Sequence, residues 1–498
     1  MQIPFFIPKI LLFIFLLFIK SFFILLNIMI NKDNINYESS LVSKDNTDEV
    51  KTNNLERNKN IFILIIILII FIIAIAISIY FIIKYMEKVK YDDGEKDPEN
   101  ALYGCMCDAG SSGTRVNVYR WPQRKKNIIP IMTEMGRNTT KPGIHEQDEK
   151  ELEKNMNILL DYCKNKIIEL SNNKSNLSDV NFYLKATAGM RSISEEEQNK
   201  KLDIIRNVIR KSEFKFLEDD WAKVINGSEE GLFGWMTSNY LNQILLNNEE
   251  KGKQIDMPYG SIDLGGYSLE ITFSTNETIK EHYINLSFTE VDYDLYSYSF
   301  HDYGQTRFYE ILMESIFNSS RSENSTIIVN PCYLEGYNET FEYENVNYTF
   351  VGKTNTSQCQ EYIRSILKIN KESEKSMNDV YQPKIPEDLK FYGISGLYWI
   401  ANFFNISDDD VFHSGLEILN ITEKYCKTKW EDTIKEYKVE EEFLKRYCFL
   451  GYYLYDLLVE GFKIDKNRKV ITFPAKIHGV ETGWTLGAMS YEIGLLPL

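Results

Sequence analysis

The stretch CDAGSSGTRVNVYRWP, residues 107–122, places an acidic residue at the start of a glycine- and serine-rich turn between two apolar runs. The first run ends at Cys107 and the second resumes at Val116. A plain hairpin needs only two turn residues of the Asn-Gly kind. The longer turn from Gly110 to Arg115 lets backbone N–H groups converge on an anion, and its hydroxyls supply further donors. Because Gly, Ser and Asp are also ordinary turn formers, this motif alone does not separate a phosphate loop from a decorated turn.

A second stretch, GSIDLGGYSLEITF at residues 260–273, repeats this arrangement. An apolar run ends in Asp263, glycines follow, Ser268 supplies a hydroxyl, and the strand pattern returns. Asp108 and Asp263 are 155 residues apart, about the length of one domain. Two such hairpins predict an internal duplication in which each half presents a phosphate clamp to a common cleft. Two carboxylates facing each other there are suited to a hydrated divalent cation that screens phosphate charge.

The overall charge of the chain is acidic. The 498 residues carry a net charge of −16, from 72 acidic and 56 basic residues. This balance argues against nucleic acid as a partner, because no basic face is available to neutralise its phosphates. An acidic protein that handles phosphates needs metal ions or backbone donors. The two hairpins would provide backbone N–H donors in their turns and aspartates that bind a metal ion. The length allows two domains, and the sequence gives no indication of oligomeric state.

The N-terminal region differs in composition from the rest of the chain. Residues 61–83, IFILIIILIIFIIAIAISIYFII, are 23 consecutive residues without a charge. This is long enough to cross a bilayer core of about 30 Å. We predict a transmembrane helix over 61–84, preceded by a tail over 1–60 and followed by a polar stalk over 85–100.

The tail contains a second apolar segment, residues 3–30, interrupted by Lys9 and Lys20. Three interpretations stay open: a second span, a signal sequence, or a misassigned leader before a true start at Met29. If this segment were a cleaved signal, the later span would stop transfer and leave the body in the cytosol.

Glycosylation motifs help to choose between these orientations. Thirteen Asn-x-Ser/Thr sites occur, and none precedes residue 100. They lie at Asn138, Asn173, Asn176, Asn226, Asn276, Asn285, Asn318, Asn324, Asn338, Asn347, Asn355, Asn405 and Asn420. This distribution favours a glycosylated body outside the cytosol, and disulfides among the seven cysteines would fit an oxidising compartment. We predict a membrane protein whose body is lumenal, in the Golgi or another endomembrane compartment, or extracellular.

From Ala101 onward the chain alternates strand and helix patterns, which predicts α/β layering. We expect strands at 102–107, 116–120, 181–189, 260–266 and 269–274, and helices at 146–170, 195–211, 234–247, 396–404 and 441–461. The aromatic-rich region 276–380 is expected to be irregular. The chain contains no GxxxxGK[ST] and no GxSxG motif, so P-loop and serine-hydrolase chemistry are not supported.

Two further motifs lie between the hairpins. KATAGMRS, residues 185–192, ends a strand in small residues, among them Thr187 and Ala188, that allow close approach of a ligand. WAKVINGSEEGLFGWMTSNYL, residues 221–241, carries Glu230 just before a glycine and an amphipathic run. An acidic residue at a helix start also stabilises the helix dipole, so this residue alone does not indicate chemistry.

In combination, these motifs resemble a known enzyme family. DAGSSGTR (108–115), ATAGMR (186–191), SEEGLFGW (228–235) and DLGG (263–266) are similar, in the same order, to the conserved apyrase regions of the nucleoside triphosphate diphosphohydrolase (apyrase) family. The similarity continues through NPCYLEGY, SQC, SGLYWIANFF, YCFLGYYLYDLL and GWTLGAMSY, so it covers about residues 101–498.

The resemblance implies a fold and an activity. The fold would be actin-like and two-lobed, built from duplicated ribonuclease-H-like domains with the active site in the interlobe cleft. Lobe I would comprise 101–224 plus 480–498, and lobe II would comprise 225–479. The implied activity is metal-dependent hydrolysis of nucleoside tri- and diphosphates to the monophosphate and orthophosphate.

The resemblance also implies roles for individual residues. Asp108 and Asp263 would bind Ca2+ or Mg2+ through water. Glu230 would be the general base, and Ser268 would help to hold the attacking water. The groups surrounding the phosphates would be Ser111, Ser112, Gly113, Thr114, Arg115, Thr187, Ala188, Gly265, Gly266 and Tyr267.

Aromatic and cysteine residues receive roles by the same resemblance. Tyr398 and Trp484 would stack near the base and sugar, although aromatic residues at such positions are also ordinary core residues. The implied disulfides are Cys332–Cys359 and Cys426–Cys448.

One departure from the family pattern concerns the second hairpin. The family usually continues Asp-Leu-Gly-Gly with Ala-Ser-x-Gln, whereas this chain has Tyr267, Ser268, Leu269 and Glu270. The glutamate adds negative charge near the attacking water, so Glu270 joins the candidate catalytic residues. Two alternatives follow: an exopolyphosphatase-like enzyme, because Ser-x-Glu after Gly-Gly also resembles that family, and a catalytically weak nucleotide-binding ectodomain.

Overall fold

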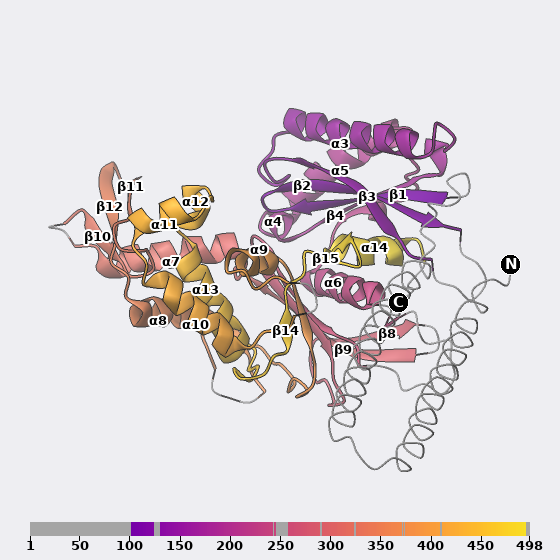
Figure 1. Cartoon of the computed structure of the whole chain (residues 1–498). Helices are drawn as coiled ribbons and strands as arrows, with labels where there is room; N and C mark the ends of the chain where they lie inside the picture. Colours follow the sequence, from indigo (N-terminus) through magenta and orange to yellow (C-terminus); the bar gives the residue numbers. More distant parts are fainter. Residues whose placement is uncertain are drawn as a thin grey trace, which may run out of the picture. The chain divides into compact units, whose positions relative to one another are not determined.

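A computed structural model describes residues 101–123, 130–242, 244–245, 257–288, 291–322, 325–370, 372, 374–408 and 411–494 (Figure 1). The expected tail, transmembrane helix and stalk, and the Asn324 glycosylation motif, lie outside the described residues. Within the described residues, no helix is both long and apolar enough to cross a membrane. Every element below belongs to one compact unit of the chain, Tyr91–Leu498.

The first sheet has five strands in the order β3-β2-β1-β4-β5. β1 pairs antiparallel with β2, and β2 with β3, while β4 runs parallel to both β1 and β5. The strands are β1 (Ala101–Gly110), β2 (Gly113–Pro122), β3 (Thr133–Thr140), β4 (Asn181–Ala186) and β5 (Ala222–Val224). On one face, Cys105 and Cys107 of β1 share a core with apolar residues of α3 (Glu149–Leu170) and α5 (Glu195–Lys211). β1 reads as a near-continuous apolar run because both of its faces are covered.

The second sheet repeats this topology. Its order is β14-β13-β6-β7-β9-β8, with antiparallel β6–β7 and β7–β9 pairs and parallel β6–β13 and β13–β14 pairs. Without the extra edge strand β8, the order and directions match those of the first sheet. The strands are β6 (Gly260–Leu264), β7 (Ser268–Ser274), β8 (Tyr283–Phe288), β9 (Val291–His301), β13 (Phe391–Ser395) and β14 (Ile471–Thr472). The internal duplication predicted from the two hairpins is therefore confirmed.

Two helices, α6 (Gly227–Leu241) and α14 (Trp484–Glu492), lie between the sheets (Figure 1). One apolar cluster contains Met106 of the first sheet, Ile394 of the second, Trp235 of α6 and Met489 of α14. The two helices approach closely at Gly487, where a Cβ would overlap the Phe233 carbonyl. Both sheets are thus packed against one shared pair of helices.

The region 276–380 is more regular than expected. It contains β8, β9, α7 (Gln305–Ser320), α8 (Thr356–Leu367) and a three-stranded sheet, β10-β12-β11. These three strands are β10 (Ile327–Asn330), β11 (Asn338–Tyr343) and β12 (Val346–Gly352). The aromatic residues that obscure the periodicity are packing residues: the Phe317 ring lies 5.4 Å from the Phe341 ring and 4.9 Å from the Tyr348 ring.

The remaining α-helices and β-strands are α4 in the first half of the chain and the others in the second half. They are α4 (Ala188–Arg191), α9 (Gly396–Phe403), α10 (Gly415–Cys426), α11 (Trp430–Glu436), α12 (Glu441–Leu444), α13 (Tyr447–Tyr455), β15 (Lys476–Ile477) and β16 (Val480–Glu481). Disulfides join Cys332 to Cys359 and Cys426 to Cys448, the pairing that the resemblance implies. The cysteines of the first sheet and α3, Cys105, Cys107 and Cys163, are buried free thiols.

The strand expected at 181–189 ends at Ala186, and Ala188 begins α4. The helix expected at 146–170 begins at Glu149. Two other expected helices differ more. The helix expected at 234–247 begins at Gly227, because Asn226 and Glu229 form a capping box that starts α6 seven residues earlier. The helix expected at 441–461 is divided into α12, α13 and a π-helical turn over Asp456–Gly461. Asp456 in that turn is buried and accepts a hydrogen bond from Arg364 of α8 at 2.9 Å.

A buried ion pair attaches α14 to the first sheet. The Lys185 ammonium at the end of β4 lies 2.6 Å from Glu492 Oε1 and donates to the Asp220 carbonyl. Removing one partner leaves an uncompensated charge, so Lys185→Ala is expected to lower the free energy of unfolding by about 3 kcal/mol. Urea unfolding followed by tryptophan fluorescence measures this. The double variant Lys185→Met/Glu492→Leu should lose less, and equal losses would contradict the assignment.

Candidate active site

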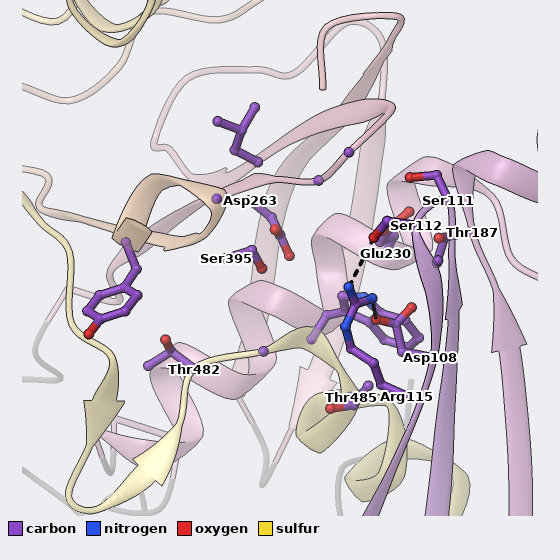
Figure 2. Close-up of a pocket in the computed structure, with 18 of the residues that line it drawn as sticks. Asp108, Ser111, Ser112, Arg115, Thr187, Glu230, Asp263, Ser395, Thr482 and Thr485 are labelled. Atoms are coloured by element: carbon purple, nitrogen blue, oxygen red, sulfur yellow. Dashed lines mark hydrogen bonds and ion pairs between the residues drawn. The ribbon is translucent and has the colours of Figure 1, made fainter. Parts of the chain in front are cut away.

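A cavity of about 510 Å³ lies between the turns of the β1–β2 and β6–β7 hairpins. This volume is in the range of small-molecule sites. Figure 2 shows Ser111, Ser112 and Thr187 on one side of the cavity and Asp263 with Ser395 on the other. The predicted residues that line it are Asp108, Ser111, Ser112, Arg115, Thr187, Ala188, Glu230, Asp263, Gly265, Gly266, Tyr267, Ser268, Tyr398 and Trp484. Residues 155 positions apart in the sequence therefore face one space.

Three predicted residues are not part of the cavity lining. Gly113 and Thr114 already belong to the β2 ladder, opposite Gly110 and Ala109, so only Ser111 and Ser112 form the tip of the turn. Glu270 lies on β7 behind the second turn and is 1% exposed. Gly113 and Thr114 are therefore strand residues that support the first turn, and Glu270 lies beneath the cavity.

The first hairpin directs an aspartate and an arginine to the cavity. Asp108 and Arg115 are opposite each other across the β1–β2 ladder, and their Oδ2 and Nη1 atoms lie 3.5 Å apart. Arg115 Nη2 also donates to Ser112 Oγ at 3.1 Å, as the dashed lines in Figure 2 indicate. Burial raises the pKa of Asp108, and the Arg115 charge opposes this rise. The hairpin thus holds a carboxylate, a guanidinium and a hydroxyl in one group.

The second hairpin is fixed from behind by α7. The carbonyls of Gly265 and Gly266 accept hydrogen bonds from the N–H groups of Gln305 and Thr306 at the start of α7, both at 3.0 Å. A Cβ on Gly266 would overlap the hydroxyl of Ser111. The tips of the two hairpins are therefore in contact, and a side chain at position 266 would have to displace the Ser111 hydroxyl.

Glu230 lies on the first turn of α6, where it lines the cavity but is only 6% exposed. Its Oε2 accepts two hydrogen bonds from Arg191, from Nη1 and Nη2, each at 3.1 Å. Burial and the nearby Glu270 charge raise the pKa of Glu230, and Arg191 opposes this rise. Burial, with a further contribution from Glu270, also raises the pKa of Asp263 to about 7. The site concentrates negative charge where solvent is scarce, which is typical of functional sites.

Comparison with known proteins shows the family to which the chain belongs. Residues 95–497 match the profile of the GDA1/CD39 (nucleoside phosphatase) family. The chain belongs to this family. It is 28% identical over 432 residues to ectonucleoside triphosphate diphosphohydrolase 1 of Rattus norvegicus, covering 80% of this chain and 82% of the relative. It is 31% identical over 437 residues to the Bos taurus protein of the same name, with the same coverage.

Two further similarities agree with this assignment. Probable apyrase 3 of Arabidopsis thaliana is 28% identical over 414 residues, covering 78% of this chain and 82% of the relative. A crystal structure of nucleoside triphosphate hydrolases from Neospora caninum superposes with a TM-score of 0.61 at 14% identity, covering 84% of this chain and 99% of that chain. The structural likeness shows the shared α/β fold. This GDA1/CD39 family member is an enzyme of the apyrase type, and its division into the two lobes stays a prediction.

The two aspartates of this family member fit a divalent cation. Asp108 and Asp263 line the same cavity, and Asp263 Oδ2 is buried without a hydrogen-bond partner. Carboxylate oxygens are the ligands that Ca2+ and Mg2+ prefer. Among the described residues, no group of three or more His, Cys, Asp or Glu side chains is arranged to hold a metal ion.

Aromatic residues gather at another part of the cavity lining. Tyr398 and Trp399 are adjacent on α9, with ring centroids 5.0 Å apart, and Trp399 is 60% exposed. Trp484 lines the cavity but is only 5% exposed, because it packs against Phe233 in the core between the sheets. Trp484 is therefore a core residue that also lines the cavity, its stacking on a base stays a prediction, and the exposed ring belongs to Trp399.

Sequence reasoning missed several residues of the site. Arg191 lies in the ATAGMR motif, but only the folded structure shows that it donates a hydrogen bond to Glu230. Trp399 follows a predicted stacking residue, yet its apolar neighbours suggest a core position. Charged lining residues from β3 and the β15–β16 hairpin had no sequence signal: Glu134, Arg137, Lys476 and Glu481.

Proposed function

We propose that this enzyme hydrolyses nucleoside tri- and diphosphates to the monophosphate and orthophosphate in a reaction that requires Ca2+ or Mg2+. The observation that carries the proposal is the meeting of two duplicated hairpins, with Asp108 and Asp263, at a cavity that Glu230 also lines. The names of the relatives, ectonucleoside triphosphate diphosphohydrolases and an apyrase, support the same substrate class.

In the proposed reaction, Glu230 accepts a proton from a water molecule as the water oxygen attacks the terminal phosphorus. The new P–O bond forms as the bridging P–O bond to the leaving phosphate breaks, and the bridging electron pair stays with the leaving nucleotide. The Ser268 hydroxyl holds the water in line with this bond. A cation held by Asp108 and Asp263 would neutralise charge on the phosphate oxygens.

The remaining groups hold the substrate. The hydroxyls of Ser111, Ser112 and Thr187, the Arg115 guanidinium and the Ala188 backbone would contact one phosphate. The backbone of Gly265, Gly266 and Tyr267 would contact another. Glycine-rich turns are suited to this because they bring backbone donors close to an anion.

The aromatic residues on α9 are expected to set affinity rather than rate. Stacking of a base on an aromatic ring contributes about 1–3 kcal/mol, so Tyr398→Ala/Trp399→Ala should raise the KM for ATP by about 10-fold with little change in kcat. Steady-state kinetics with ATP and inorganic tripolyphosphate measure this. The KM for tripolyphosphate should stay unchanged, and an equal rise for both substrates would count against base stacking.

The location of the enzyme is also part of the proposal. We infer that the apolar segment at 61–83 anchors the chain in a membrane and that the glycosylated body faces the lumen or the cell exterior. The glycosylation motifs after residue 100 support this orientation.

Phosphate release by the purified full chain tests the proposed function. The substrates are ATP, ADP, UTP, UDP and polyphosphate, each with Mg2+, Ca2+ or EDTA. Release from nucleotides that needs the cation would support the proposal. Release from polyphosphate alone would instead identify an exopolyphosphatase-like enzyme. Nucleotide binding without release between pH 5 and 8 would identify a weak binding ectodomain.

A further inference from the structure

Arg191, at the end of the short helix α4, contacts four groups of the site. Its Nη1 and Nη2 donate to Glu230 Oε2, both at 3.1 Å, and Nη1 also donates to the Ile225 carbonyl at 3.0 Å. Nη2 further donates to Ser268 Oγ at 3.3 Å and lies 3.8 Å from Glu270 Oε1. One guanidinium therefore joins the proposed base, the proposed water-holding hydroxyl and the unusual glutamate of the second hairpin.

The charges around Arg191 need a counter-ion. Glu230 and Glu270 are both buried, and Asp263 is opposite Glu270 in the β6–β7 ladder. Carboxylates that repel each other at low dielectric are costly unless a cation compensates them. In the part of the chain that the structure describes, Arg191 is the basic residue within ion-pairing distance of both Glu230 and Glu270.

The internal duplication shows why the positive charge beside Glu270 comes from a residue outside the second hairpin. In the first hairpin, Asp108 is opposite Arg115; in the second, Asp263 is opposite Glu270. The two ladder positions are equivalent, seven residues after each aspartate, and their charges are opposite. The second hairpin thus has the acidic Glu270 where the first has the basic Arg115. The compensating positive charge comes from Arg191 of α4, the helix that follows β4 of the first sheet.

A second contact fixes Glu270 on its other side. Ser299 Oγ, on the neighbouring strand β9, donates to Glu270 Oε1 at 2.7 Å. Glu270 is therefore held by the hydroxyls of Ser268 and Ser299 and by Arg191, behind the cavity, and it does not line the cavity itself. Its position is that of a counter-ion rather than of a second base.

We propose that Arg191 is a positioning residue for hydrolysis, and that Glu270 acts as its counter-ion. Arg191 orients the Glu230 carboxylate and the Ser268 hydroxyl toward one water position, and Glu270 with Ser299 orients Arg191. The proposal rests on the proposed function, since it assigns Arg191 through Glu230. It follows that the glutamate at position 270 leaves the enzyme active.

Kinetics of the full chain with ATP and Mg2+ test this with five variants: Arg191→Lys, Arg191→Met, Glu270→Gln, Arg191→Met/Glu270→Gln and Arg206→Met. Arg191→Met should lower kcat about 100-fold with a KM change below about 3-fold, because the lost contacts orient the base rather than bind substrate. Arg191→Lys should lower kcat about 10-fold, since an ammonium lacks the planar fork. Glu270→Gln alone should change kcat less than about 5-fold, because a glutamine oxygen still accepts from Ser299 and Arg191 keeps its two hydrogen bonds to Glu230.

The double variant gives the sharpest readout. Removing Glu270 in the Arg191→Met background removes the uncompensated carboxylate, so kcat should recover about 10-fold relative to Arg191→Met. Arg206→Met is the matched control, because Arg206 lies under the same sheet and donates to the Ala222 carbonyl, away from the cavity. It should leave kcat unchanged.

Several results would overturn the proposal. Independent, multiplicative effects in the double variant would do so, as would a rise in KM with unchanged kcat in Arg191→Met. If Arg191→Met fails to fold, kcat is compared among Arg191→Lys, Glu270→Gln and their double variant instead. Multiplicative effects of these two substitutions on kcat would then overturn the proposal. A wild-type chain without hydrolysis would reject the proposed function itself, whereas hydrolysis that needs Glu230 but not Arg191 would reject only this inference.

Discussion

Glu230→Gln should lower kcat for ATP hydrolysis by about 10²–10⁴-fold, the usual contribution of a general base. The amide keeps the shape and accepts hydrogen bonds from Arg191 through its oxygen, but it cannot take the proton of the attacking water. Because Glu230 is not expected to bind the phosphates, KM should change by less than about 3-fold. Steady-state phosphate release with ATP and Mg2+ measures both values.

The adjacent carboxylate on the same helical turn provides the control. Glu229 caps α6 by accepting from the Asn226 N–H, and a glutamine at this position also forms a capping box. Glu229→Gln should therefore keep kcat within about 3-fold of wild type. Equal effects of the two substitutions would show that the loss comes from the helix start and not from a base.

Asp263→Asn should lower kcat by about 10²–10³-fold at 1 mM Mg2+, a loss comparable to that of other charge-stabilising groups in active sites. Asp263 Oδ2 is buried and has no hydrogen-bond partner, and a cation would supply the missing interaction. Raising the Mg2+ concentration should restore part of the activity, because the amide weakens cation binding without removing the site. Titration of phosphate release with Mg2+ measures this recovery.

An exposed aspartate of the same sheet serves for comparison. Asp294 on β9 accepts a hydrogen bond from Tyr283 at the surface. Asp294→Asn should leave both kcat and the Mg2+ dependence unchanged. If Asp263→Asn were equally active at every Mg2+ concentration, the assignment of the cation to the two hairpins would be wrong.

Much of the site could be predicted because its chemistry lies in short motifs. Each hairpin carries its aspartate and its turn within eight residues, so local strand and turn patterns were enough to find Asp108 and Asp263. The 155-residue spacing between them indicated the duplication that the sheet order then confirmed. The helix over 195–211 was predicted with its observed bounds, since Ser194 and Glu197 form a capping box at its start.

The missed parts depend on contacts between distant segments. Arg191 reaches Glu230 across 39 residues and Glu270 across 79, and no local pattern gives these distances. The sheet of β10, β11 and β12 was missed because its aromatic residues pack inward without a clear alternation. Trp399 was missed because exposure of a residue in an apolar run depends on which face of α9 the core covers.

The most direct test of the account is the fate of water oxygen in a single turnover. The full chain is mixed with ATP and Mg2+ in H2¹⁸O, and the label is measured in orthophosphate and in the nucleotide product. Attack on the terminal phosphorus predicts one ¹⁸O atom in the first orthophosphate released and none in ADP, and the rate at which labelled orthophosphate appears should fall by about 10²–10⁴-fold in Glu230→Gln. Label in the nucleotide, or labelled orthophosphate that appears at the wild-type rate in Glu230→Gln, would contradict water attack at the terminal phosphate with Glu230 as base.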